Sequence, residues 1–273
     1  MKVVVKIGGT LLEDAAGRKR IATLLARHFE RGRRLLIVHG GGKQLTTYLE
    51  RAGVASEFVS GLRVTTAETL DGVVKVFAGT VNHNLLAALH AAGVAAVGIS
   101  GIDDGCLSAE KLRGDQGEDW GYVGRITHAD PRVWEALLGA DLLPVMACLA
   151  VGEDGQIYNV NADQAAVACA VHWQADRLVF LTDVDGVRDG RGRVLDRVAA
   201  EDIPALLKSG PATGGMLAKL HAVEEALAGG LSQVRISNGH RDGAWDDLFS
   251  EDATEKGAAG TVFVSSLPMA KKS

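Results

Sequence analysis

The chain has 273 residues, of which 47% are hydrophobic and 23% are charged. This balance is typical of a globular protein with a sizeable core, folded as one large domain or as two coupled lobes. The formal net charge of −5 excludes a general attraction to nucleic acid. The sequence also lacks a secretion signal and an apolar run of the roughly 20 residues that a membrane-spanning helix needs. We therefore expect a cytoplasmic protein without nucleic-acid or membrane partners.

Short β-branched runs alternate along the chain with segments of helical period. The expected strands lie at residues 3–5, 35–38, 95–99, 143–146, 178–181 and 234–236. The expected helices lie at residues 21–29, 45–49, 73–77, 85–89, 134–138, from about 163, and 216–228. This alternation predicts an α/β fold: a three-layer αβα sandwich around a mainly parallel open sheet, with two lobes.

Two polar, glycine-rich segments, residues 107–126 and 149–158, interrupt the alternation and are expected to form hairpins or lids near a site. A soft boundary near Ala175–Asp176 divides the chain into residues 1–175 and 176–273, which we expect to be lobes of one continuous sheet. The three cysteines, Cys106, Cys148 and Cys169, have no metal-ligand or redox spacing and are expected to be buried.

Glycine-rich turns directly follow the first two expected strands, at Gly8–Gly9 and at Gly40–Gly42. Ligands of open α/β sheets gather at the carboxyl ends of strands, where helix N-termini offer free N–H groups to anions. Glycine is also used in such turns for purely steric reasons, but two consecutive turns favour a site for phosphate or carboxylate. The second turn is not a P-loop, because Ile37 stands where the first glycine belongs and Gln44 replaces the Mg²⁺-binding hydroxyl.

Four charged residues occupy positions at which a role in catalysis or binding would explain a charge. Lys6 ends an apolar strand, and Lys219 follows a glycine turn one helical turn into the last helix. Phosphoryl transfer depends mainly on positive charge around the migrating group. Asp163 could pair with both lysines, or could simply favour a helix N-terminus, and Arg63 suits bidentate recognition of a carboxylate.

Nine collinear blocks of the chain resemble the amino acid kinase family. The blocks are Lys6–Gly9, Val38–Gly42, Gly61–Thr65, Ala78–Asn82, Gly121–Gly124, Asn159–Ala166, Leu181–Val187, Gly214–Lys219 and Gly260–Phe263. Within that family the chain resembles the members that phosphorylate N-acetylglutamate in arginine biosynthesis. The resemblance implies transfer of the γ-phosphoryl group of ATP to a side-chain carboxylate, which gives an acyl phosphate.

The resemblance also implies a role for each matching residue. Lys6 and Lys219 would be catalytic and Asp163 would hold both in place. The phosphoryl oxygens and the substrate would be surrounded by the backbone N–H groups of Gly8, Gly9, Gly41 and Gly42. Arg63 and Asn159 would also bind the substrate. The nucleotide would lie against Asp183, Val184, Asp185, Gly186, Val187, Arg188, Pro211, Ala212 and Thr213.

Residues 1–175 would accordingly bind the substrate and form a homodimer, and residues 176–273 would bind the nucleotide. Mg²⁺ would arrive with ATP, with no dedicated metal site on the protein. His39 has no partner at metal-ligand spacing and is expected to be structural.

Three alternatives stay open. N-acetylaminoadipate is one methylene longer than N-acetylglutamate, a difference worth about 1–3 kcal/mol of discrimination. N-succinylglutamate differs only in its acyl group. A non-catalytic nucleotide sensor with the same fold is less favoured, because such a protein should have lost at least one of Lys6, Asp163 and Lys219.

Overall fold

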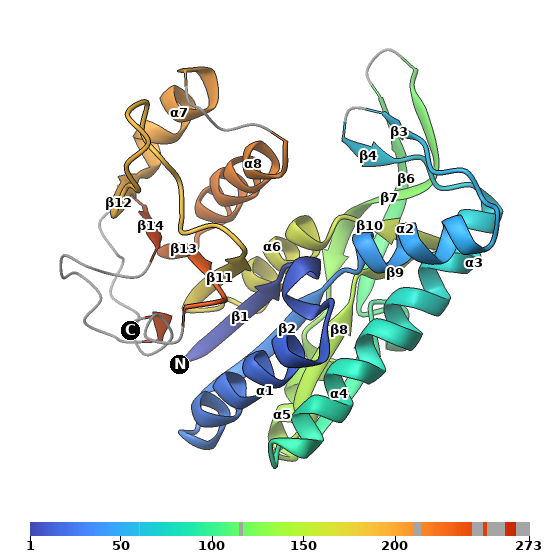
Figure 1. Ribbon diagram of the computed structural model, residues 1–273, viewed down its shortest axis with the longest axis horizontal. Coiled ribbons are helices and arrows are strands. Elements are labelled where there is room, and N and C mark those ends of the chain that lie inside the picture. Colours follow the sequence, from blue (N-terminus) through green and yellow to red (C-terminus); the bar gives the residue numbers. More distant parts are fainter. Residues whose placement is uncertain (60, 115–116, 210–213, 242–247, 250–259, 266–273) are drawn as a thin grey trace.

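The computed structural model describes residues 1–59, 61–114, 117–209, 214–241, 248–249 and 260–265 (Figure 1). The strands in these ranges are β1 (Lys2–Ile7), β2 (Arg34–His39), β3 (Phe58–Val59), β4 (Leu62–Arg63), β5 (Ala96–Ser100), β6 (Leu107–Arg113), β7 (Asp119–Ala129), β8 (Leu143–Ala147), β9 (Leu149–Val151), β10 (Ile157–Val160), β11 (Arg177–Thr182), β12 (Arg197–Ala199), β13 (Gln233–Asn238) and β14 (Thr261–Val264). The α-helices are α1 (Ala15–Glu30), α2 (Gly42–Arg51), α3 (Ala67–Val74), α4 (Asn82–Ala91), α5 (Arg132–Gly139), α6 (Ala162–His172), α7 (Ile203–Ser209) and α8 (Gly215–Ala228). Shorter turns are the 3-10 segments η1 (Gly9–Leu12), η3 (Asp103–Gly105) and η4 (Ala200–Asp202) and the π-helical turn η2 (Lys75–Val81).

The central sheet has eight strands in the order β12-β14-β13-β11-β1-β2-β8-β5. The six strands from β13 to β5 are all parallel, and β14 runs antiparallel to β13. The predicted mainly parallel sheet is therefore confirmed, and all six expected strands belong to it. The chain leaves β1 toward β2, whereas after β11 it forms β12 and β13 on the other side of the sheet. The carboxyl ends of β1 and β11 thus flank a topological switch point, where open α/β sheets bind ligands.

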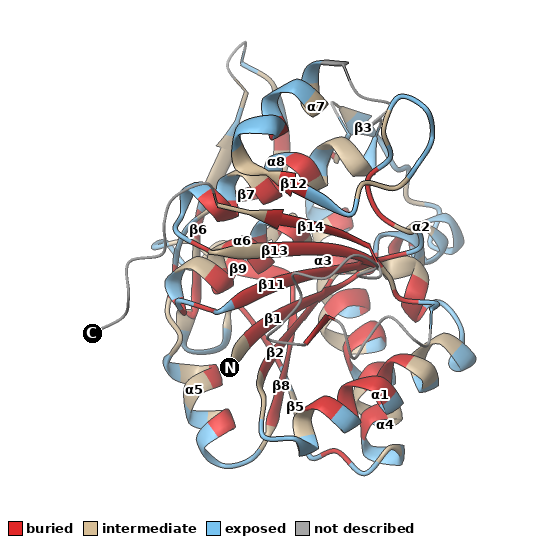
Figure 2. Ribbon diagram, turned by 90° about the vertical axis from the view of Figure 1, so that its left-hand side faces the viewer, coloured by how far each residue is buried: buried red, intermediate tan, exposed pale blue. Residues whose placement is uncertain are grey.

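Helices cover both faces of this sheet, which confirms the three-layer sandwich (Figure 2). Helices α1 and α4 pack together on one face, and α6 and α8 pack together on the other face, which α5 also covers. The strands between the two helical layers are largely buried: β11 is buried along its whole length and β1 from Val3 to Ile7. Such continuous apolar strands are typical of parallel sheets covered on both sides.

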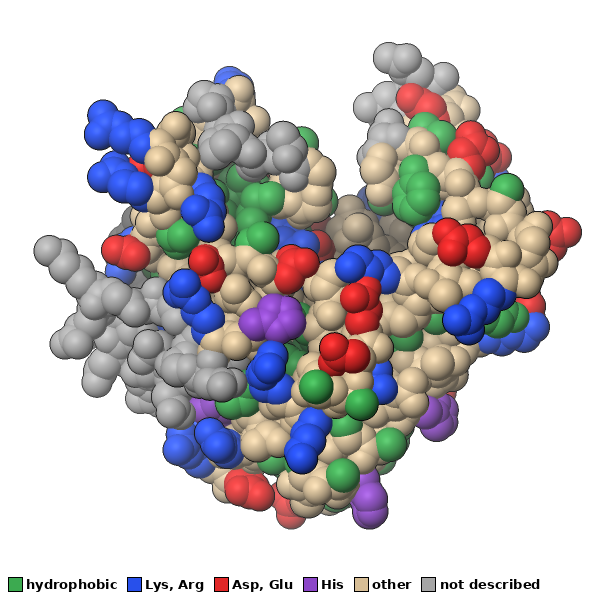
Figure 3. All heavy atoms as spheres, viewed as in Figure 1, with side chains coloured by type: hydrophobic (Ala, Val, Ile, Leu, Met, Phe, Trp, Pro, Cys, Tyr) green, Lys and Arg blue, Asp and Glu red, His purple; other side chains and the backbone are tan. Residues whose placement is uncertain are grey.

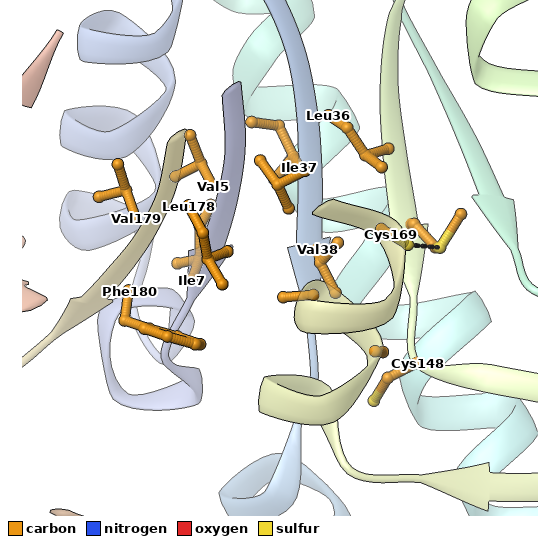
Figure 4. Packing of buried hydrophobic residues seen from close by; sticks show 14 of the residues in the cluster. Val5, Ile7, Leu36, Ile37, Val38, Cys148, Cys169, Leu178, Val179 and Phe180 are labelled. Carbon is orange, nitrogen blue, oxygen red and sulfur yellow. Dashed lines mark hydrogen bonds between the residues drawn. The ribbon is translucent and has the colours of Figure 1, made fainter. Parts of the chain in front are cut away.

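The middle of the core lies between β1, β2, β11 and the helices beside them (Figure 4). Val5, Ile7, Val38 and Phe180 meet there with no exposed surface. The three cysteines are buried and unpaired, as expected from the sequence. Burial raises the pKa of the Cys106 and Cys148 thiols to about 12 and raises that of Cys169 as well.

The two glycine-rich segments form the predicted hairpins. The first becomes β6 and β7, and the second becomes β9 and β10; together they close into a small four-stranded barrel. The short hairpin of β3 and β4 lies beside it, because the Thr65 N–H donates to the Trp120 carbonyl and the Tyr122 N–H donates to the Thr65 carbonyl. This arrangement carries Arg63 toward β10.

The sequence analysis did not identify β12, β14 or α7. Strands β12 and β14 are only three and four residues long and pair with each other at the edge of the sheet, so neither shows a sustained period. The π-helical turn between α3 and α4 was also not predicted, since periodicity cannot distinguish it from a continuous helix. Within the described ranges, the helices are too short or too polar to cross a membrane.

Candidate active site

Lys6, Asp163 and Lys219 meet at the carboxyl end of β1. The Lys6 Nζ lies 2.7 Å from Asp163 Oδ1, and the Lys219 Nζ lies 3.3 Å from Asp163 Oδ2. Lys6 comes from β1, Asp163 from the first turn of α6, and Lys219 from the first half of α8. Asn161 caps α6 by accepting from the Asp163 N–H at 2.8 Å, which fixes the carboxylate near the lysines. The structure therefore brings together the three residues for which the sequence suggested a joint role.

These three charges are largely shielded from water, with side chains 8–13% exposed. Burial by itself raises the pKa of Asp163, but Lys6 and Lys219 outweigh it and hold that pKa below its ordinary value. Burial lowers the pKa of Lys219, although Asp163 opposes that shift. Two ammonium groups facing one carboxylate leave a net positive charge, which suits an anionic reacting group.

The two glycine turns lie against each other beside this cluster. A Cβ on Gly9 would lie 3.7 Å from the Gly42 nitrogen, and the Gln44 side chain donates to the Gly9 carbonyl at 3.2 Å. Gly42 begins α2, so its N–H has no partner within the helix. The two turns thus place the Gly42 N–H beside Gly9 at the carboxyl ends of β1 and β2.

Gly8 differs from the other three glycines. The resemblance implies that its N–H faces the phosphoryl oxygens, but this N–H donates to the Leu181 carbonyl at 2.8 Å. It therefore joins β1 to β11 instead of facing a ligand. A side chain at this position would also lie 3.1 Å from the Leu181 oxygen.

Arg63 is a buried cation, and no carboxylate pairs with it in the described part of the chain. Its guanidinium donates to the hydroxyls of Ser56 at 2.5 Å and Thr46 at 2.7 Å, and it lies 4.5 Å from the centre of the Phe58 ring. Burial lowers the pKa of Arg63. An oriented guanidinium without a protein counter-charge suits a ligand carboxylate.

Asn159 lies in the same region as Arg63. Its side-chain amide donates to the Thr65 hydroxyl at 3.1 Å, and that hydroxyl donates to the Arg63 carbonyl at 3.0 Å. The sequence analysis missed Ser56, Thr46 and this bridging role of Thr65, although Thr65 stands in one of the nine blocks.

The loop Asp183–Arg188 follows β11 on the other side of the lysine cluster. Asp185 accepts from Asn238 at 2.9 Å and pairs with Arg241 at 3.1 Å, which ties the loop to the end of β13. Val184 is 41% exposed, whereas Val187 is buried and its N–H donates to Thr261. The remaining predicted nucleotide contacts, Pro211, Ala212 and Thr213, lie outside the described residues.

The molecular surface is hollowed between two sets of elements (Figure 3). One side carries α7 and α8, and the other carries α2, α3 and the β3–β4 hairpin (Figures 1 and 3). Arg63 and Asn159 belong to the second side, and Lys219 belongs to the first. In the described ranges, no three His, Cys, Asp or Glu side chains gather in a way that could hold a metal ion.

Comparison with known proteins defines the protein family to which this chain belongs. The model of the amino acid kinase family matches residues 1–238. The chain belongs to that family, whose members use ATP.

Two curated relatives are acetylglutamate kinases. The protein from Solibacter usitatus is 50% identical over 244 residues, which cover 89% of this chain and 93% of the relative. The protein from Acidobacterium capsulatum is 44% identical over 255 residues, covering 93% and 97%. Among solved structures, smu.665 from Streptococcus mutans superposes with a TM-score of 0.81 at 28% identity, covering 96% of this chain and 98% of that one.

Proposed function

We propose that this chain is an N-acetylglutamate kinase of arginine biosynthesis: it transfers the γ-phosphoryl group of MgATP to the side-chain carboxylate of N-acetyl-L-glutamate and forms the acyl phosphate. One observation carries the chemistry: the Asp163 carboxylate holds Lys6 of the central strand β1 and Lys219 of α8. The choice of substrate is supported by sequence identities of 50% and 44% to two curated acetylglutamate kinases over nearly their whole length.

The two lysines would act on the transferred group. Its negative charge is spread over three oxygens in the transition state, so ammonium groups on two sides stabilise it more than either reactant. Asp163 would keep both ammonium groups in position. An ionised carboxylate is itself the nucleophile, so the reaction needs no general base.

Mg²⁺ would enter on the triphosphate. Asp163 is poorly suited to bind it, because each carboxylate oxygen already faces an ammonium group. The ion would neutralise charge on the β- and γ-phosphates while the protein supplies the lysines and the N–H groups of Gly9, Gly41 and Gly42.

The substrate would lie on the side of the hollow formed by residues 1–175. Arg63 would bind the α-carboxylate, replacing solvent with a charge-assisted hydrogen bond. Asn159, which is already oriented by Thr65, would contact the acylamino group. The nucleotide would lie on the other side, built from residues 176–273, against the Asp183–Arg188 loop.

A hydroxylamine trap tests this proposal, because acyl phosphates give coloured hydroxamates. The chain is incubated with MgATP and, in separate reactions, N-acetylglutamate, N-acetylaminoadipate, N-succinylglutamate or aspartate. We expect the highest kcat/KM with N-acetylglutamate. A higher value with another acid would reassign the substrate, and no hydroxamate with any of them would refute the kinase assignment.

We also propose that the chain is a homodimer, as the family resemblance implies. Light scattering on the eluate of a size-exclusion column measures the mass directly. A mass equal to one 28.6 kDa chain across micromolar concentrations would contradict this proposal.

A further inference from the structure

His39 and Asn82 form a fully enclosed pair beneath the second glycine turn. His39 is the last residue of β2 and has no exposed surface, and Asn82 begins α4 with 2% exposure. Their side chains meet at 3.0 Å, between His39 Nε2 and Asn82 Nδ2. Their hydrogen bonds go to each other, to Gly40 and to Val145, and the proposed mechanism has not used them.

The surrounding groups define which ring nitrogen carries the proton. His39 Nδ1 lies 2.9 Å from the Gly40 carbonyl, which can only accept, so Nδ1 must be the protonated nitrogen. Nε2 then accepts from the Asn82 amide, which also donates to the Val145 carbonyl at 3.0 Å. Burial lowers the pKa of His39 to about 4, against the opposing effect of the Gly40 bond, so the ring is neutral at physiological pH.

This hydrogen bond determines the direction of the next peptide group. Because the peptide bond is planar and trans, the carbonyl of Gly40 and the N–H of Gly41 point in opposite directions. A Gly40 carbonyl held toward the His39 ring therefore turns the Gly41 N–H away from it. Gly41 is buried, and its N–H has no acceptor among the residues described. A buried N–H without a partner usually marks a place for a ligand or an ordered water.

The turn itself is packed on both sides. A Cβ on Gly40 would lie 3.4 Å from Ala162, the residue before Asp163, and a Cβ on Gly41 would lie 3.0 Å from Phe77 and Val81 of the π-helical turn. The π-helical turn also brings Asn82 under His39. The glycine turn is thus held between the helix that carries Asp163 and the helix that carries Asn82.

We propose that His39 and Asn82 are positioning residues: by holding the Gly40 carbonyl inward, they aim the Gly41 N–H at an anionic oxygen of the reacting groups. The inference rests on the proposed function, because it assigns that N–H to phosphoryl transfer. It requires a neutral imidazole with its proton on Nδ1 and assigns no proton transfer to His39.

Two substitutions of His39, by asparagine and by glutamine, separate the role of Nδ1 from that of Nε2. An asparagine amide can occupy the place of Nδ1 and still donate to Gly40, whereas a glutamine amide reaches the place of Nε2 and leaves the Gly40 carbonyl without its donor. We expect His39→Gln to lower kcat at least tenfold, as loss of one oriented donor costs about 10²–10³, with little change in the KM for ATP. His39→Asn should retain several-fold more kcat than His39→Gln.

Thermal unfolding of both variants provides the control. Asparagine is one methylene shorter than glutamine and leaves the larger gap in the core, so a loss of packing alone would make His39→Asn the more impaired variant. A kcat that follows the melting temperature, or equal kcat in the two variants, would overturn the positioning role. ¹⁵N NMR of the histidine-labelled full-length wild type gives an independent readout and should show a protonated Nδ1 and an unprotonated Nε2 for His39. The reverse tautomer would also overturn it.

These results are distinguishable from failure of the proposed function. A wild-type chain that makes no hydroxamate refutes the kinase assignment and, with it, any role of Gly41 in transfer, even if the tautomer is as expected. An active wild type with the reverse tautomer refutes only the positioning role.

Discussion

Asp163 has a different partner on each carboxylate oxygen, and those partners come from strands and helices far apart in the chain. Removing the carboxylate would leave two buried ammonium groups facing each other. A buried charge that loses its partner is costly because neither water nor the protein then compensates it. Loss of the Asp163 carboxylate should therefore lower both the free energy of unfolding and the catalytic rate.

Asp163→Asn tests this expectation. We expect kcat to fall by about 10² or more and the free energy of unfolding to fall by about 3 kcal/mol or more, measured by hydroxamate formation and urea unfolding. Lys43→Ala is the control for stability, because its pair with Glu13 at 3.0 Å is at the surface, with the lysine side chain 62% exposed. It should change stability by no more than about 0.5 kcal/mol. Equal losses in the two variants would contradict the buried-cluster interpretation.

Lys219 should define the alkaline limit of activity. Burial lowers its pKa below the ordinary 10.5, so the folded chain releases this proton before an unfolded lysine does. Between the two pKa values the unfolded chain binds more protons, and the contribution of Lys219 to the free energy of unfolding rises with pH. Activity changes in the opposite direction, because neutral Lys219 no longer stabilises the transferred group.

The measurement is kcat from about pH 7 to about pH 10 for the wild type and for Lys219→Arg. We expect kcat of the wild type to decline in the alkaline range below pH 10.5. The arginine variant should be slower throughout but free of that decline, since its charge persists. An unchanged alkaline decline in Lys219→Arg would assign it to another group.

Single residues differ in how far sequence reveals their role. Lys6 could be suspected because a charge at the end of an apolar strand is unusual, and its pairing with Asp163 is now observed. Ser56 and Thr46, which hold Arg63, gave no such signal, because hydroxyl residues are common in loops and on helix surfaces. The blocked N–H of Gly8 could not be predicted either, since it depends on pairing with β11.

At the scale of elements, β4 and β7 meet where the proposed substrate contacts are held. Gly121 has a φ of +69°, and a Cβ there would lie 2.2 Å from the Thr65 carbonyl. Any side chain at this position must displace the segment that links Arg63 to Asn159. A small shift of a binding segment can have a large effect on a reaction that depends on alignment.

Gly121→Ala should therefore raise the KM for N-acetylglutamate about tenfold or more while changing the KM for ATP little. Gly117→Ala is a matched control, because Gly117 also has a positive φ, +88°, but a Cβ there would meet nothing within 4 Å. Steady-state kinetics with each substrate varied in turn gives both constants. The same KM for N-acetylglutamate in the two variants would show that the contact with Thr65 is unimportant.

The elements that sequence revealed are those with a sustained period. Strands such as β1 and β11 are mostly apolar because helices cover both faces of the sheet, so they stand out from their surroundings in the sequence. Strands β12 and β14 add to the edge of the sheet beside β13, and a segment of three or four residues is too short to show a period. The π-helical turn has a wider hydrogen-bonding pattern than an α-helix, but its amino-acid composition is that of an ordinary helix. It can therefore be recognised only from the structure.

For the whole molecule, the fold class followed from the order of elements, because alternating strands and helices permit few architectures. The pairing of β11 with both β1 and β13 makes one sheet across residue 175. We expect this sheet to unfold as a single cooperative unit, although we propose that residues 1–175 and residues 176–273 bind different reactants.

Ile236→Ala on β13 tests this expectation, since Ile236 has no exposed surface and its truncation should cost about 2–5 kcal/mol. Three of the four tryptophans, Trp120, Trp134 and Trp173, lie in residues 1–175 and report on that half by fluorescence. We expect their urea midpoint to fall together with the midpoint from circular dichroism. A fluorescence midpoint that stays at the wild-type value would show that the halves unfold separately.

The burial of all three cysteines has a practical consequence. Only the thiolate reacts with alkylating reagents, and a pKa of about 12 leaves almost none of Cys106 or Cys148 in that form at neutral pH. The cysteines of the natural chain should therefore react very slowly with maleimide dyes. Cysteines introduced at Tyr48, 36% exposed on α2, and at His221 of α8, whose side chain is 61% exposed, would carry a donor and an acceptor fluorophore on the two sides of the hollow. Energy transfer between them could follow, in single molecules, whether the two sides approach each other during turnover.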